Sequence, residues 1–180
     1  TGILIDRAQD LVSASIPEAS PEQLLRKLER AARECARLGL TTIHDAGVGE
    51  RELDAYRTLI REKRLPVRIY AMIGGEGALW RRYLESGPEI GDRLTVRSIK
   101  LMGDGAMGSR RAAFLETYAD DPGNSGLLMH TKEDIERVAR DAAARGFLVI
   151  SHAIGDRANR EALEAYGAVL GGANSRRFRI

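Results

Sequence analysis

Three side chains in this sequence could take part in chemistry where a strand ends: Lys100, His152 and His44. Lys100 lies late in the apolar run 94–102, and the glycine-rich segment 103–108 ends that run. A lysine there can enter a crevice at the carboxyl edge of a parallel sheet, where α/β folds keep their active sites. Within the run, two sets of residues alternate as in a regular strand: Val96, Ser98 and Lys100 with Arg97, Ile99 and Leu101.

The ammonium group of Lys100 needs an explanation, because burying an unpaired charge is costly. An ion pair with Asp104 or another carboxylate is the simplest one. A desolvated amine could instead act as a Schiff-base nucleophile. A neutral amine could also capture carbon dioxide and become a carbamate, which would bridge two divalent ions through its oxygens. The residues alone leave these three alternatives open.

The histidines differ in their expected roles. His152 ends the predicted strand 147–152 and reaches the edge that Lys100 also reaches, so it is either a hydrogen-bonded core histidine or a metal ligand. His44 precedes Asp45 at the end of an earlier short strand. We expect His44 to serve structure or substrate contact rather than metal binding, and the pattern does not decide which of the two side chains points inward.

Strands and amphipathic helices alternate along the chain. After an apolar stretch at Ile3 to Ile5, strands are expected over 41–47, 66–73, 94–102, 147–152 and from 178, with helices over 20–39, 50–63, 78–84, 131–146 and 157–170. This order predicts a parallel α/β sheet with helices packed against it. A doubly wound sheet and a (β/α)₈ barrel share the pattern, but a full barrel needs about 250 residues. We therefore expect residues 1–180 to form a single incomplete domain.

Composition excludes several classes of protein. Lys and Arg number 28 against 26 Asp and Glu, so no strong net charge favours nucleic acid or an anionic membrane. The single cysteine, Cys35, excludes an internal disulfide framework and a multi-cysteine zinc site. Neither a membrane-length apolar run nor a signal peptide is present, which predicts a cytoplasmic location.

A dinucleotide-binding domain is a competing interpretation, because Gly103, Gly105 and Gly108 fit the G-x-G-x-x-G pattern after a strand. That pattern requires an acidic residue at the end of a second strand about 20 residues later. The sequence has a turn-rich segment at 120–126 instead.

Three segments resemble the amidohydrolase superfamily, and within it amidohydrolase family 3, the branch similar to N-substituted formamide deformylases. They are TTIHDAG at 41–47, the long segment from Ser98 to Leu128, and SHAIGDRA at 151–158. The resemblance implies a metal-dependent (β/α)₈ TIM barrel, of which this chain would form about strands two to five and the start of strand six.

The resemblance also implies roles for individual residues. Lys100 would be carbamylated by carbon dioxide and would bridge two metal ions, usually zinc. The complete enzyme would hold one or two such divalent ions. His152 would be a further metal ligand, and both residues would serve catalysis. Asp104, Ser109 and Arg110 fall in the loop that borders the substrate pocket in this family. The resemblance assigns no role to His44, which stays a candidate for substrate contact from its position alone.

The implied reaction is hydrolysis of a non-peptide carbon–nitrogen bond in a small amide-like or formamide-like substrate by metal-activated water. Such enzymes also use a His-x-His pair after strand one, a histidine after strand six and an aspartate after strand eight, and this sequence contains none of these. We therefore expect the 180 residues alone to have weak metal affinity and little activity.

A second hypothesis, which assigns no enzymatic activity to the chain, is a non-catalytic α/β half-barrel. Its open strand edges at 41–47 and 178–180 would need another segment, a partner chain or a second copy to cover them. Four aromatic residues could shape a pocket, but we expect them to serve helix packing: Trp80, Tyr83, Phe114 and Tyr118.

Overall fold

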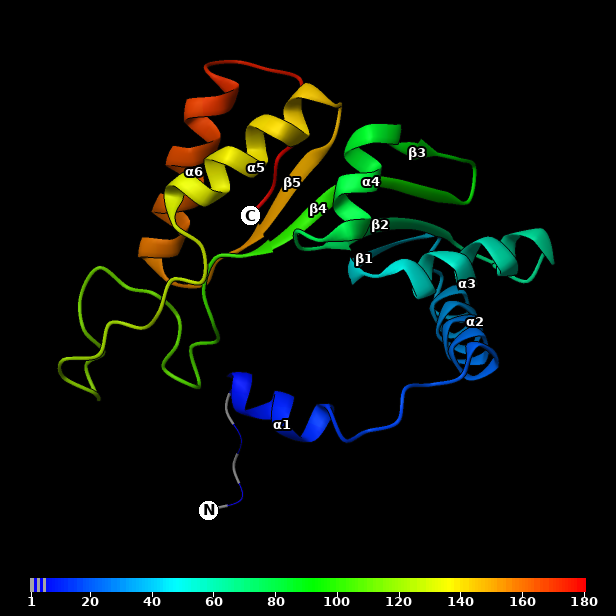
Figure 1. The fold of residues 1–180 in the computed structure, drawn as a ribbon, viewed down its shortest axis with the longest axis horizontal. Helices are drawn as coiled ribbons and strands as arrows, with labels where there is room; N and C mark the ends of the chain where they lie inside the picture. Colours follow the sequence, from blue (N-terminus) through cyan, green and yellow to red (C-terminus); the bar gives the residue numbers. More distant parts are fainter. Residues whose placement is uncertain (1, 3, 5) are drawn as a thin grey trace.

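The computed structural model describes residues 2, 4 and 6–180, and strands alternate with helices along them (Figure 1). Ile3 and Ile5, from the apolar stretch near the start, lie outside the described residues. The strands are β1 (Thr42–Val48), β2 (Arg68–Gly74), β3 (Glu89–Ile90), β4 (Leu94–Met102) and β5 (Leu148–His152). The helices are a 3₁₀ turn (Asp6–Gln9), α1 (Asp10–Ser13), α2 (Pro21–Arg37), α3 (Glu50–Arg61), α4 (Ala78–Ser86), α5 (Lys132–Ala144) and α6 (Asp156–Leu170).

Four strands form a parallel sheet in the order β1, β2, β4, β5. The two-residue strand β3, which the sequence did not predict, pairs antiparallel with the first half of β4. Beyond β5, Arg179 forms a parallel bridge with Ile150, where the sequence predicted the start of another strand. This topology confirms the parallel α/β fold.

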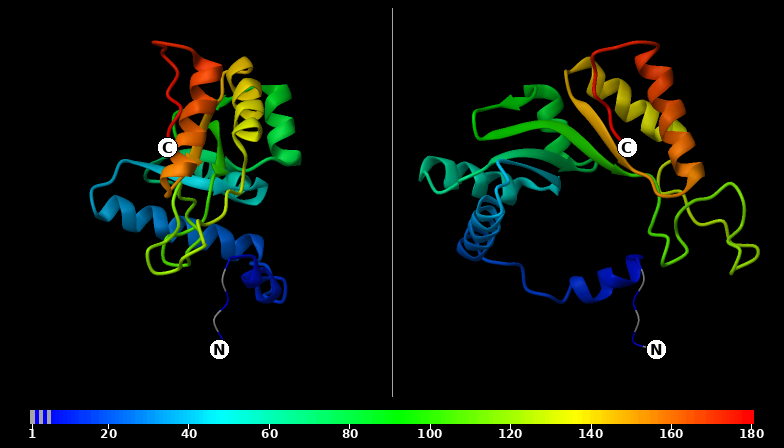
Figure 2. Two further views of the ribbon diagram at one scale, coloured as in Figure 1. Left: turned by 90° about the vertical axis from the view of Figure 1, so that its left-hand side faces the viewer. Right: turned by 180° about the vertical axis from the view of Figure 1, so that it is seen from behind.

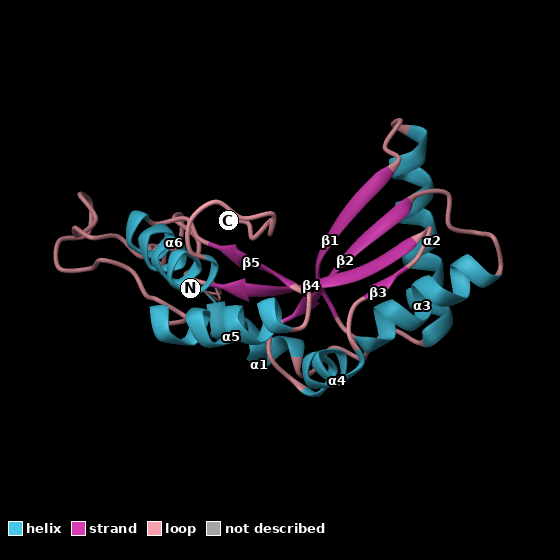
Figure 3. Ribbon diagram, turned by 90° about the horizontal axis from the view of Figure 1, so that it is seen from above, coloured by secondary structure: helices cyan, strands magenta, loops and turns pink. Residues whose placement is uncertain are grey.

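The long helices lie on one side of the sheet. Figure 3 shows α3, α4, α5 and α6 around the outside of the fanned strands, with α2 next to α3. We call the helix-covered side the outer face and the other side the inner face. The short helix α1 lies apart from the sheet in all three views of Figures 1 and 2.

Local capping explains where two of these helices begin. The Ser20 hydroxyl accepts a hydrogen bond from the Gln23 amide, and the Gln23 side chain accepts one from the Ser20 amide. Thr131 and Asp134 exchange the same pair of bonds at the start of α5. Serine followed three residues later by glutamine, and threonine followed by aspartate, are sequence patterns typical of such caps.

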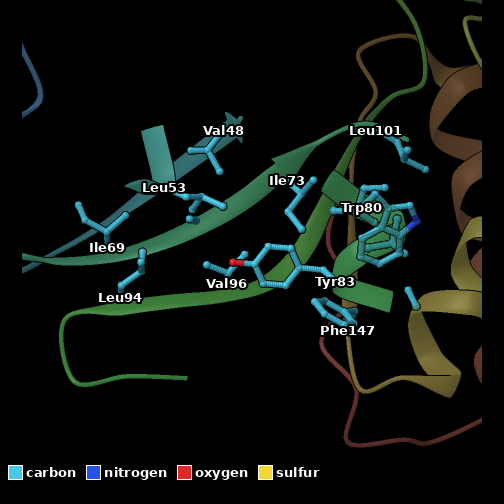
Figure 4. Packing of buried hydrophobic residues seen from close by; sticks show 14 of the residues in the cluster. Val48, Leu53, Ile69, Ile73, Trp80, Tyr83, Leu94, Val96, Leu101 and Phe147 are labelled. Carbon is cyan, nitrogen blue, oxygen red and sulfur yellow. The ribbon is translucent and has the colours of Figure 1, made fainter. Parts of the chain in front are cut away.

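The outer face and its helices enclose the apolar core (Figure 4). Phe147 is fully buried and packs edge-on against Trp80, at 5.1 Å between ring centroids, and against Tyr83, at 6.4 Å. Trp80 and Tyr83 are buried residues of α4, so the prediction that they serve helix packing is confirmed.

A bulge in β4 decides which residues face the inner side. Ala71 pairs with Val96, but the next residue of β2, Met72, pairs with Ser98, so Arg97 is an extra residue in β4. As a result Val96 lies in the core together with two residues from the other alternating set, Ile99 and Leu101. The regular alternation expected from the sequence, which put Val96 on the face of Lys100, is therefore wrong.

Candidate functional site

Lys100 and His152 lie on the same face of two adjacent strands. Lys100 pairs with Ile150, and Met102 pairs with His152. Paired residues of parallel strands point to one side, and so do residues two apart on one strand. Since the neighbouring Ile99, Leu101 and Val149 fill the core, Lys100 and His152 face the inner side. Strand spacing and rise place their Cα atoms about 8 Å apart.

The Lys100 amine is half-buried and lacks a carboxylate partner. Nζ donates a long hydrogen bond to the Leu101 carbonyl oxygen, at 3.4 Å. Within the part of the chain that the structure describes, Lys100 forms no ion pair, so of the three alternatives the ion pair with Asp104 or another carboxylate does not hold. Burial lowers the pKa of the Lys100 amine from its usual value, because a low-dielectric environment disfavours the ammonium form.

Asp104 is fully buried, and its carboxylate binds backbone amides. One oxygen accepts hydrogen bonds from the Ala113 and Gly155 amides, both at 2.8 Å, and the other accepts one from Ile154 at 2.9 Å. The latter oxygen lies 3.8 Å from His152 Nε2, too far for a hydrogen bond. Asp104 therefore joins the loop after β4 to the turn after β5, which differs from the substrate contact expected for it.

Close backbone packing fixes the same turn. A Cβ atom at Gly155 would lie 1.8 Å from the Ala113 carbonyl oxygen, so only glycine fits there. That oxygen also accepts bonds from the Arg157 and Ala158 amides at the start of α6. Sequence reasoning did not assign these roles, although Gly155 within SHAIGDRA was an available signal.

The loop after β4 forms an open groove of about 690 Å³. Arg110 lines it and pairs with Asp120 at 2.9 Å, and its backbone φ is 55°. Phe114 and Tyr118 also line the groove, with ring centroids 5.0 Å apart, so the expectation of helix packing is wrong for this pair. Ser109 is not among the lining residues, and its hydroxyl bonds to the Ala106 carbonyl.

His44 is the third residue of β1, not the last, and it lies away from Lys100. It pairs with Tyr70, and its ring stacks on that phenol ring at 4.9 Å. Lys100 pairs with Gly74, four residues further along β2, a separation of about 13 Å along the strand. His44 Nδ1 is 3.0 Å from Nη1 of Arg179, and burial, followed by the Arg179 charge, lowers the pKa of the imidazole.

The neighbouring Asp45 points to the outer face instead, where it accepts a 2.6 Å hydrogen bond from the Tyr56 hydroxyl. The structure thus separates the two polar residues at this strand, a choice that the sequence left open.

The donor set is partial for a metal. No cluster of three or more His, Cys, Asp or Glu side chains suited to a metal occurs among residues 2, 4 and 6–180. An unpaired, half-buried amine beside an imidazole nevertheless fits two positions of a larger ligand set. The dinucleotide interpretation does not fit, because the next helix after Gly103 to Gly108 begins only at Lys132.

Fold and site together define a parallel α/β protein with a lysine and a histidine at the carboxyl end of adjacent strands. The sequence model of the amidohydrolase family Amidohydro_3 matches residues 1–179, and the chain belongs to this family. No narrower specificity within the family follows from this match.

Similar proteins support the assignment. YtcJ of Bacillus subtilis (strain 168), whose name places it among the amidohydrolases, is 32% identical over 92% of this chain. LONG AFTER FAR-RED 3 of Arabidopsis thaliana is 31% identical over the whole chain. Crystal structures of uncharacterized metal-dependent hydrolases from Pyrococcus horikoshii OT3 and Pyrococcus furiosus superpose with TM-scores of 0.78 and 0.77, at 30% identity, over 89% and 90% of the chain.

The chain spans about a third of the length of these proteins: 32% and 33% of the two curated relatives, and 33% and 34% of the two solved structures. Separately, none of the helices in the described residues combines the length and apolar character that crossing a membrane requires.

Proposed function

We propose that this chain supplies part of the active site of a metal-dependent hydrolase that cleaves non-peptide carbon–nitrogen bonds in small amide-like or formamide-like substrates. The observation that carries the proposal is the half-buried, unpaired Lys100 amine on the same inner face as His152. Family membership and the metal-dependent hydrolases among the similar structures give the reaction class.

The Lys100 amine is suited to carbamylation. Burial lowers its pKa and so raises the fraction of neutral amine at a given pH. The neutral nitrogen adds to the carbon of carbon dioxide, a C–N bond forms, and one proton leaves to solvent. The product is an anionic carbamate, which replaces a costly buried cation with two oxygen acceptors.

Lys100 as carbamate and His152 as neutral imidazole would hold one or two divalent ions, zinc in our proposal. A bound divalent ion polarises the substrate carbonyl and makes water nucleophilic near neutral pH. The buried Asp104 carboxylate holds the turn after β5, and with it His152, in a fixed position relative to β4. Arg110 and the aromatic pair of the groove would contact the substrate, with Ser109 nearby.

The test uses the complete polypeptide encoded by the gene that contains these residues. Lys100→Ala should abolish turnover of an N-formyl amine and remove the carbamate carbon signal that ¹³C-labelled bicarbonate gives in NMR. Lys132→Ala, which changes a half-buried lysine paired with Glu164 at the start of α5, is the matched control. A variant without Lys100 that keeps stoichiometric metal and full turnover would refute the assignment.

For the 180-residue chain by itself we propose weak metal affinity and little turnover, because its two donors form an incomplete set. Elemental analysis after dialysis against zinc, with an assay on the same sample, measures both. Stoichiometric zinc together with rapid turnover would show that further ligands are dispensable.

A non-catalytic half-barrel is the second candidate, and one observation favours it: β1 pairs only with β2 in the described residues, which leaves a strand edge open. A second copy could pair there and form a homo-oligomer. Sedimentation of the chain over a range of concentrations tests this, and a monomer at all of them would count against it.

A further inference from the structure

A second hollow lies on the inner face at the amino end of the strands, away from Lys100. It has a volume of about 870 Å³ and is lined by strand residues such as Tyr70 and Thr95. Thr95 pairs with Tyr70, and Lys100 pairs with Gly74 four residues further along β2, so the two levels lie about 13 Å apart. We call it the arginine hollow, since its charged lining residues are Arg97, Arg176, Arg177 and Arg179, with His44 beside them.

No carboxylate balances these four arginines. The lining of the hollow contains neither Asp nor Glu. None of the four forms an ion pair with any residue that the structure describes, whereas Arg57, Arg64 and Arg137 each pair with a glutamate. The hollow is therefore a local concentration of positive charge in a protein whose overall charge is close to balanced.

The contacts that the four arginines do make are to neutral groups. Arg97 donates to the Gly146 carbonyl at 3.0 Å, and Arg176 donates to the Ala143 carbonyl at 2.6 Å. Arg179 lies over the Tyr70 ring, 5.1 Å from its centroid. Most of their N–H donors thus remain available.

Two polar atoms at the hollow are buried without a partner: Nε of Arg179 and the hydroxyl of Tyr70. Buried donors are nearly always hydrogen-bonded, because an unsatisfied one costs free energy. Both groups can donate to an oxygen, and an arginine cannot lose its proton. An anionic acceptor would satisfy both donors and balance the charge.

We propose that the arginine hollow binds an oxyanion, a phosphate or carboxylate group, independently of the hydrolytic site. The planar guanidinium group matches the geometry of these anions and binds them in a bidentate manner. The oxygens can come from a free anion or from carboxylate side chains of another polypeptide segment, and both use the same chemistry.

The experiment titrates the 180-residue chain with inorganic phosphate at constant ionic strength and measures binding by isothermal calorimetry. We expect saturable binding that Arg177→Gln and Arg179→Gln each weaken about tenfold, as for the loss of one charge-assisted contact. Arg177 is exposed, and its side chain forms neither a hydrogen bond nor an ion pair with residues 2, 4 and 6–180, so its substitution should leave the fold intact. Circular dichroism checks the fold of the Arg179 variant.

Arg81→Gln, an exposed arginine of α4 outside the hollow, is the matched control and should leave phosphate affinity unchanged. Absence of saturable binding would overturn the proposal. An equal loss in the Arg81 and Arg177 variants would overturn it too, because it would show non-specific screening.

The two sources of the oxyanion are separated with the complete polypeptide encoded by the gene. If that protein also binds phosphate and loses it in the Arg177 variant, the natural ligand is a free anion. If only the 180-residue chain binds phosphate at the hollow, carboxylates of the polypeptide fill the site.

Discussion

The two faces of the sheet use the same strands for different purposes. On the outer face, Val96, Ile99 and Leu101 of β4 are fully buried beneath helices. On the inner face, the same strand presents Lys100, and Met102 beyond it is 39% exposed. Within β4 the outer-facing side chains therefore belong to the core, whereas Lys100 and Met102 face the inner side.

The difference also concerns how polar groups are satisfied. On the outer face the Asp45 carboxylate accepts a bond from the Tyr56 hydroxyl. On the inner face the Lys100 amine and the hydroxyl of Tyr70 lack strong partners. Unsatisfied groups cost stability, and they are the groups that remain free to bind a ligand.

The largest expected effect is on the outer face. Phe147→Ala should lower the free energy of unfolding by about 3–5 kcal/mol, because it removes a fully buried ring packed against two others. Urea denaturation followed by circular dichroism measures it. Met102→Ala on the inner face is the control, with an expected cost below about 1 kcal/mol. Equal costs would show that the two faces do not differ in this way.

The second-largest effect on stability is expected at Asp104, whose carboxylate connects the loop after β4 to the turn after β5. Asp104→Ala leaves three backbone amides without an acceptor, for an expected cost of about 3 kcal/mol. Hydrogen exchange should quicken at Ile154 and Gly155. Asp120→Ala, which removes only an exposed ion pair in the same loop, should change neither quantity measurably.

Lys100→Met should stabilise the metal-free chain, by about 0.5–1 kcal/mol, since a half-buried ammonium group is replaced by an apolar side chain of similar length. The pKa of the amine is lowered in the folded state from its usual 10.5, so unfolding takes up a proton between the two values and wild-type stability rises with pH there. The gain in the variant should be full below the folded-state pKa and vanish above about pH 10.5. A gain that does not change over this range would contradict a burial penalty at Lys100.

The smallest effect concerns the rim of the helical layer. Arg64 and Arg33 bind Glu29 of α2 and lower the pKa of that carboxyl from 4.5 to about 2. The stabilisation by Glu29 should therefore be complete above pH 4.5 and disappear as the pH falls towards about 2. Thermal melts of wild type and Glu29→Gln across this range should converge at the acidic end. Curves that stay parallel would show that the ion pair contributes nothing.

The arrangement of elements was predictable because its signals are local. Helical spacing and β-branched runs depend on neighbours a few residues away, as do the caps at Ser20 and Thr131 where two of the predicted helices begin. Strand β3 was not predicted because a strand of two residues is too short to show an alternating pattern of apolar and polar residues. The bulge at Arg97 was missed because pairing with β2, not the sequence of β4, determines it.

The site was predictable only in part. Lys100 and His152 could be placed at one edge because strand ends in a parallel sheet coincide. The contacts of Asp104 with Ile154 and Gly155, fifty residues away, could not be inferred from spacing. The contact between Arg179 and His44, which are 135 residues apart in the sequence, could not be inferred from spacing either.

The sequence by itself determined the order of the long helices and the parallel strands, the sheet edge that Lys100 and His152 share, and a resemblance that family membership bears out. Only the tertiary structure decided which side each strand residue faces. It also decided that the Asp104 carboxylate connects two loops by hydrogen bonds, and that four arginines line one hollow that contains no carboxylate. The physical reason is range: helix caps and periodicity act within a few residues, whereas register, burial and charge balance depend on groups that folding brings together from distant parts of the chain.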